Sequence, residues 1–214
     1  MKPIEVLQLY ASKYFKKESI PLNRKFAREG NQELTDYYSC FCDISVLTPE
    51  KIMSIIELLK FKEEIEKRNY RGEIQLSTSS DALEILSNIL KEKFEFSKDE
   101  IELYKRSLAQ IMKIYFSKNK NLKFLRVWID IEDLYRINEA LSIFPSCNIF
   151  LTGDYYLISL EKLERLWFLH PYQLLYYLAN LYSIDISLPI NFEVIKRERV
   201  IVHEISKTLK YASY

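Results

Sequence analysis

The sequence predicts an α/β fold in which helices flank a mixed β-sheet. Segments with the period of a helix alternate along the chain with segments that have the period of a strand, and short turn signals separate them. With 214 residues and 48% hydrophobic content, the chain is long enough to bury a full core in one domain. We therefore expect a single domain over residues 1–214, with a helical insertion at 81–118.

Local signals place the elements of the first half. Pro3 begins an apolar stripe at helical spacing, and Thr48 followed by Pro49 is a typical helix start. Ser97 and Glu100 have the spacing of a capping box, in which each side chain bonds the other's backbone N–H. We expect helices over 3–17, 48–67, 81–93 and 98–117, and strands over 37–46 and 71–77.

The second half alternates in the same way. Apolar Leu125, Val127, Ile129 and Ile131 alternate with polar residues and Trp128, which is typical of a strand with one buried face. The other elements that we expect are a helix through 134–141, a strand–turn–strand hairpin over 147–158 with its turn at 152–154, a helix through 160–166, a helix over 171–183, and a hairpin pairing 192–195 with 200–205.

Two carboxylates stand on the expected strand. Asp130 and Glu132 would project from the same face of the sheet, one pleat apart, because side chains alternate along a strand. They could then bind one hard divalent cation such as Mg²⁺, which takes oxygen ligands. The alternative is that both face water at the end of the strand, and that Asp133 only caps the following helix.

Composition excludes several classes of function. The 31 basic and 30 acidic residues give a net charge of +1, so any nucleic-acid site must be a local patch. Three glycines are too few for a P-loop or a dinucleotide fingerprint, and we expect no organic cofactor. Cys40, Cys42 and Cys147 lack the C-x-x-C spacing, which favours a reducing compartment without zinc. Apolar runs are short, so we expect a cytoplasmic protein without membrane contact.

Five motifs stand in the order of those of a known family. They are Arg24-Lys-Phe-Ala27, Glu73-Ile-Gln-Leu-Ser-Thr-Ser79, Trp128-Ile-Asp-Ile-Glu132, Asn148-Ile-Phe-Leu-Thr-Gly153 and the stretch from Val200 to Ser213. They resemble motifs of the small, catalytic subunit of archaeal and eukaryotic DNA primases. The Asp-x-Glu pair is similar to the metal-binding Asp-x-Asp of that family, and Thr152-Gly153 resembles its Ser-Gly turn. The resemblance implies an archaeo-eukaryotic primase-like fold.

The resemblance also implies site residues. In an active protein, Asp130 and Glu132 would bind Mg²⁺ or Mn²⁺, and Glu204 would be the third catalytic carboxylate. The residues implied to bind the nucleotide are Arg24, Lys25, Arg28, Thr152 and Tyr156. The chain departs from the family where Tyr155 or Tyr156 replaces a histidine, where His203 aligns with the third carboxylate unless the register slips to Glu204, and where the zinc knuckle is missing.

These departures shape the expected function. We expect a divergent primase-small-subunit-like protein with an eroded site, acting as a non-catalytic accessory in DNA replication. Its partners would be another replication or primase subunit and a DNA or RNA template. One alternative is an active compact primase-polymerase that uses Asp130, Glu132 and Glu204. The other is a cytosolic protein-interaction module with no nucleic-acid role, which the neutral net charge favours.

Overall fold

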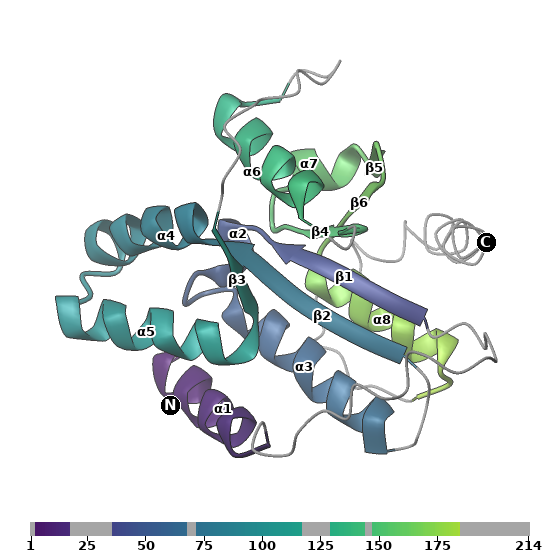
Figure 1. The fold of residues 1–214 in the computed structure, drawn as a ribbon, viewed down its shortest axis with the longest axis horizontal. Coiled ribbons are helices and arrows are strands. Elements are labelled where there is room, and N and C mark those ends of the chain that lie inside the picture. The colour runs from purple at the N-terminus through teal and green to yellow at the C-terminus, as the bar shows by residue number, and fades with distance from the viewer. Residues whose placement is uncertain (1–2, 18–35, 68–71, 117–128, 144–146, 185–214) are drawn as a thin grey trace.

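The computed structural model describes residues 3–17, 36–67, 72–116, 129–143 and 147–184. In these ranges the protein is α/β, with a mixed six-stranded sheet and eight helices (Figure 1). The strands are β1 (Asp36–Cys42), β2 (Gly72–Ser79), β3 (Lys113–Tyr115), β4 (Ile149–Leu151), β5 (Lys162–Leu163) and β6 (Leu166–Leu169). The helices are α1 (Pro3–Lys17), α2 (Ile44–Leu47), α3 (Ile52–Lys67), α4 (Ser80–Lys93), α5 (Lys98–Ile111), α6 (Ile131–Ser142), α7 (Tyr155–Ser159) and α8 (Pro171–Leu181).

The strands lie in the order β3-β2-β1-β4-β6-β5. Neighbouring strands are parallel throughout, except that β5 forms an antiparallel hairpin with β6. The chain leaves β1 toward β2 on one side and returns through α6 to β4 on the other, so the direction of winding reverses between β1 and β4. In open α/β sheets, ligands bind at the carboxyl ends of the strands beside such a reversal.

The two faces of the sheet carry cores of different size. The larger core includes residues of α1, α3, α4, α5 and α8, together with Cys40 and Cys42 of β1. The smaller core includes Phe41 of the same strand and residues of α6 and α7. Figure 1 shows α6 and α7 on one side of the sheet and α1, α3, α5 and α8 on the other. Alternation along β1 therefore supplies both cores.

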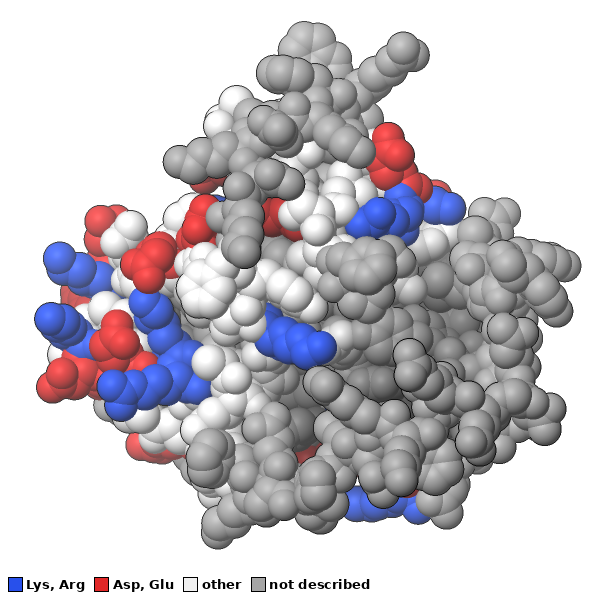
Figure 2. Space-filling model, viewed as in Figure 1, with Lys and Arg blue, Asp and Glu red and all other residues white. Residues whose placement is uncertain are grey.

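Helix starts follow their local signals. Ser97 and Glu100 form the expected capping box, and Pro171 occupies the first turn of α8 behind the capping residue His170. The predicted helices over 3–17, 81–93 and 171–183 are confirmed to within a few residues, as is the strand over 71–77. On the outer side of α4 and α5, basic and acidic side chains alternate (Figure 2), and Lys105 pairs with Glu84 at 2.9 Å. This side is a solvated surface.

The strand prediction over 125–131 is wrong at its described end. Residues 129–130 form no strand, and Ile131 begins α6, because the Asp130 side chain accepts a hydrogen bond from the Glu132 N–H and so caps a helix. Residues 125–128 lie outside the described part of the chain, as does the predicted hairpin over 192–205.

Four further element predictions are wrong. The strand expected over 37–46 ends at Cys42, and α2 follows it. The returning strand expected within 147–158 is α7, and the helix expected through 160–166 is the β5–β6 hairpin. All four residues of β6 are buried, and a strand buried on both faces lacks the alternation that marks a half-buried one. The helix expected over 98–117 ends at Ile111, and β3 follows it, so α4 and α5 form a crossover between neighbouring strands. No helix in the described ranges is long and apolar enough to cross a membrane.

Candidate functional site

Asp43 stands at the carboxyl end of β1, at the point where the winding reverses. Its Oδ2 accepts hydrogen bonds from the Ser45 N–H, the Ser45 hydroxyl and the Thr152 hydroxyl, the last at 3.1 Å. Only 6% of the residue is exposed. Within the described part of the chain Oδ1 accepts no hydrogen bond, so this oxygen is the one left for a further ligand.

The turn after β4 is joined to the end of β1. The Gly153 N–H donates to the Ser45 hydroxyl at 2.8 Å, and the Asp154 N–H donates to the Thr152 hydroxyl at 3.1 Å. Asp154 then caps α7 by accepting from the Tyr156 N–H at 2.7 Å. These bonds hold the two strand ends in a fixed relation, and they bring a second carboxylate to the same edge of the sheet.

The first turn of α6 supplies three more carboxylates. Asp130 caps the helix through Oδ1, which accepts from the Glu132 N–H at 2.8 Å, and Glu132 itself is exposed. Asp133 is the third residue of the helix and is only partly exposed. Negative side chains at a helix N-terminus are stabilised by the helix dipole, which accounts for part of their presence here.

The pKa of Asp133 links this residue to the other four carboxylates. Its pKa is raised from the ordinary value of 3.8 to about 6, first by burial and then by repulsion from Asp43, Asp154, Asp130 and Glu132. Repulsion between carboxylates falls with distance, so all four lie near Asp133. We call these five residues the carboxylate cluster. Among the described residues none forms an ion pair with any of the five.

The side chains are not arranged as a finished metal site. In the described ranges, no group of three or more acidic, histidine or cysteine side chains is close enough to hold a metal ion as it stands. Asp130 and Asp154 each point one oxygen at a backbone N–H as helix caps. A cation bound by the cluster would require some of these carboxylates to turn toward Asp43.

His170 follows β6 at the same edge as Asp43 and Asp154. Burial, and next the nearby Lys51 ammonium, lower the pKa of His170 to about 4, so the ring is neutral near pH 7. Its Nδ1 accepts from the Tyr172 N–H at 3.2 Å, which leaves the proton on Nε2. We therefore assign this histidine a capping role and not that of a cation.

The structure brings together only part of the predicted site. Asp130 and Glu132 belong to the carboxylate cluster, and Thr152 bonds Asp43. Tyr156 lies on α7, 49% exposed, two residues beyond Asp154. The predicted site residues that lie outside the described ranges are Arg24, Lys25, Arg28, His203 and Glu204.

Sequence reasoning missed Asp43 and Asp154, and treated Asp133 as a cap. A signal for the first two was present in the sequence. Asp43 directly follows β1, and Asp154 follows the apolar strand β4 after two residues. Carboxylates at the ends of parallel strands meet at one edge of the sheet. Asp130 and Glu132 share one segment and form a local pattern, whereas Asp43 and Asp154 belong to separate segments and form none.

The comparisons with known proteins give no family. No family model matches the chain, and neither the curated proteins nor the solved structures include a significant match.

Proposed function

We propose that the chain is a metal-dependent enzyme that hydrolyses phosphodiester bonds in nucleic acids. One observation carries this proposal: four carboxylates from three separate elements raise the pKa of a fifth, Asp133, where the sheet reverses its winding, and none of the five forms an ion pair with a described residue. Folding tolerates such repulsion at a cost, and clusters of this kind occur where charge is needed for function.

The donor set fits a hard divalent cation. All five groups offer oxygen, which suits Mg²⁺ or Mn²⁺ better than zinc, for which Cys and His are the commoner ligands. When bound, such an ion supplies charge for the phosphoryl oxygens and acidifies a bound water molecule. Asp43 is the best-placed ligand, because Ser45 and Thr152 fix its Oδ2 and leave Oδ1 free. Asp133 and Asp154 would complete the set from α6 and from the turn after β4.

Aromatic side chains beside the cluster favour a polynucleotide substrate. Tyr155 is 70% exposed and Tyr156 is 49% exposed, and both directly follow Asp154. Exposed aromatic rings provide surfaces on which bases of single strands stack. A chain of bases lying across these tyrosines would place its phosphates near the carboxylates.

The active primase-polymerase, which the sequence offers as an alternative to a non-catalytic primase-like accessory, is a second proposal. It is supported by the presence of Asp130 and Glu132 in the cluster, and by Thr152 beside Asp43. In this version Asp43, Asp133 and Asp154 supply the further carboxylates that nucleotidyl transfer needs, and a replication or primase subunit and a template are the partners. Hydrolysis and nucleotidyl transfer share two-metal chemistry, so their products must be compared directly.

Cleavage of end-labelled RNA and DNA tests the first proposal. Single- and double-stranded substrates are incubated with the full chain in Mg²⁺, Mn²⁺ or EDTA. We expect metal-dependent cleavage that Asp43→Asn lowers by about 10²–10³, which is the typical loss for one group acting on transition-state charge. Asp99→Asn, in the first turn of α5, is the matched control and should cleave normally. Cleavage that survives both Asp43→Asn and Asp154→Asn would exclude the proposal.

Nucleotide incorporation tests the second. Primed and unprimed templates are supplied with dNTPs or NTPs, and the native chain is compared with the Asp130→Ala, Glu132→Ala double variant. Incorporation that the double variant abolishes would favour the primase-like enzyme over the hydrolase. If the chain shows neither cleavage nor incorporation and binds neither nucleic acid at low salt, the protein-interaction module is the remaining hypothesis.

A further inference from the structure

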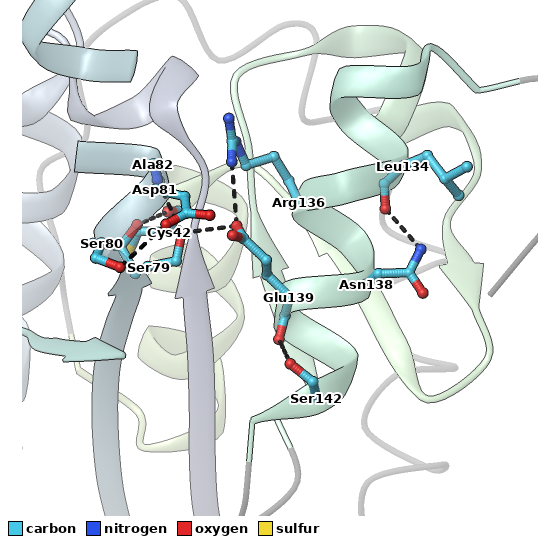
Figure 3. A network of polar contacts seen from close by, with 11 residues as sticks. Cys42, Ser79, Ser80, Asp81, Ala82, Leu134, Arg136, Asn138, Glu139 and Ser142 are labelled. Atoms are coloured by element: carbon cyan, nitrogen blue, oxygen red, sulfur yellow. Dashed lines mark hydrogen bonds and ion pairs between the residues drawn. The ribbon is translucent and has the colours of Figure 1, made fainter. Parts of the chain in front are cut away.

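Arg136 on α6 is a buried cation with most of its donors unused. The residue is 5% exposed, and its Nη1 pairs with the Glu139 carboxylate at 3.2 Å. Glu139 Oε2 also accepts from the Ser79 hydroxyl at 2.7 Å, and Ser79 caps α4. Figure 3 shows this network between α6 and the end of β2. The Glu139 carboxylate, which Ser79 also bonds, therefore fixes the position of the Arg136 guanidinium group.

The unused donors lie on one edge of the guanidinium group. Nε is the one buried side-chain polar atom in the described ranges that has no partner. Within the same ranges, the hydrogen bond and ion pair of the guanidinium group both involve Nη1 and not Nη2. Nε and Nη2 point their N–H groups in the same direction, and such an edge can bind two oxygens of one anion. A buried donor without a partner costs free energy and requires an explanation.

We propose that the Nε–Nη2 edge of Arg136 binds a phosphate group. Arg136 lies one helical turn beyond Glu132 and Asp133, so the phosphate would lie next to the carboxylate cluster. Guanidinium matches phosphate through two parallel hydrogen bonds, which an ammonium group cannot form. Glu139 and Ser79 act as positioning residues, because they hold Nη1 and leave Nε without a partner in the described ranges.

If the Arg136 edge is a subsite for a backbone phosphate of the substrate, the inference rests on the proposed function. The phosphate bound by Arg136 would be one beside the phosphate that reacts, since the carboxylates repel an anion unless a cation lies between them. Arg136 would then contribute to substrate binding in the ground state and the transition state alike. Uniform binding of that kind changes KM and leaves kcat nearly constant.

The first experiment needs no catalytic activity. Thermal unfolding of the full chain is followed in EDTA with increasing inorganic phosphate, against chloride at equal ionic strength. We expect phosphate to raise the Tm of the native chain, and Arg136→Lys to weaken the apparent affinity about tenfold, because one charged hydrogen bond is lost. The control is Arg165→Lys, whose guanidinium bonds the backbone oxygens of Cys147 and Leu141 and should bind phosphate normally.

The second experiment measures hydrolysis by the same variants. Arg136→Lys should raise KM about tenfold and change kcat little, and Arg165→Lys should match the native chain. Equal phosphate affinity in native and Arg136→Lys protein, or no effect of phosphate on native protein, would overturn the inference. So would a variant that unfolds earlier but keeps its KM, since that is the result of a purely structural ion pair. Phosphate binding that depends on Arg136 without any hydrolysis would instead refute the proposed function alone.

Discussion

The two faces of the sheet differ in how their charges are handled. On the face of the larger core, the ion pairs of α4 and α5 lie near solvent, as with Lys105 and Glu84. On the face of the smaller core, α6 carries the buried pair of Arg136 and Glu139 and the first turn with its repelling carboxylates. Apolar packing stabilises the first face, and the second, with fewer apolar contacts, holds the groups suited to chemistry. The buried and mutually repelling charges of α6 therefore lie on the side where the core is smaller.

Removing one member of the buried pair should give the largest change in stability. Glu139→Ala leaves Arg136 buried without its partner, and we expect a loss of about 3–5 kcal/mol in the free energy of unfolding. Urea denaturation at pH 7 measures it. Glu84→Ala removes the exposed partner of Lys105 and should cost about 1 kcal/mol or less. Similar losses in both variants would show that the two faces do not differ.

Lowering the pH should destabilise the fold on the larger-core face, because His170 becomes protonated. The folded pKa of about 4 lies below the ordinary value of 6.5, so the unfolded chain binds a proton between these values and the folded chain does not. The stability that the neutral His170 contributes is fully present above about pH 6.5 and is lost as the pH falls toward 4. The full shift corresponds to roughly 3 kcal/mol, and we expect about half of it because the ring keeps some contact with water.

His170→Asn keeps a capping acceptor and removes the titrating group. The unfolding free energies of native and variant protein are compared between pH 7 and pH 4. The variant should lose less stability than the native chain over that range. A difference between the two that is independent of pH would contradict the assignment of this titration to His170.

Asp133 should respond in the opposite direction, with the smallest effect. Its folded pKa of about 6 lies above the ordinary 3.8, so its contribution is most favourable below pH 3.8 and is lost as the pH rises through 6. Asp133→Asn should raise stability at pH 7 by about 1 kcal/mol, a value reduced for solvent screening. The gain in stability should disappear near pH 4. The Asp133→Asn variant should also cleave nucleic acid more slowly than the native chain. A stability loss at pH 7 would show that repulsion does not dominate there.

Local signals in the sequence predicted the parts of the fold that depend on local contacts. The capping box of Ser97 and Glu100 and the helix start at Pro171 involve residues within one turn, and both were confirmed. The segment at 129–131 was predicted wrongly because its alternation is compatible with a strand, while the cap formed by Asp130 determines the structure. Asp43 and Asp154 come together only because β1 and β4 are neighbours, and no local pattern encodes that adjacency.

The central pairing of β1 with β4 has a consequence for synthesis of the chain. Ser39 and Asn148, which bond each other beside this pairing, are 109 residues apart. At roughly 5–20 residues per second, a ribosome makes β4 about five to twenty seconds after β1. During that interval β1 can pair with β2 but has an open edge on its other side, and Phe41 lacks its stacking partner Phe150. An open strand edge with an exposed aromatic ring promotes association with other chains, so the nascent protein should need a chaperone most while residues 43–148 are being made.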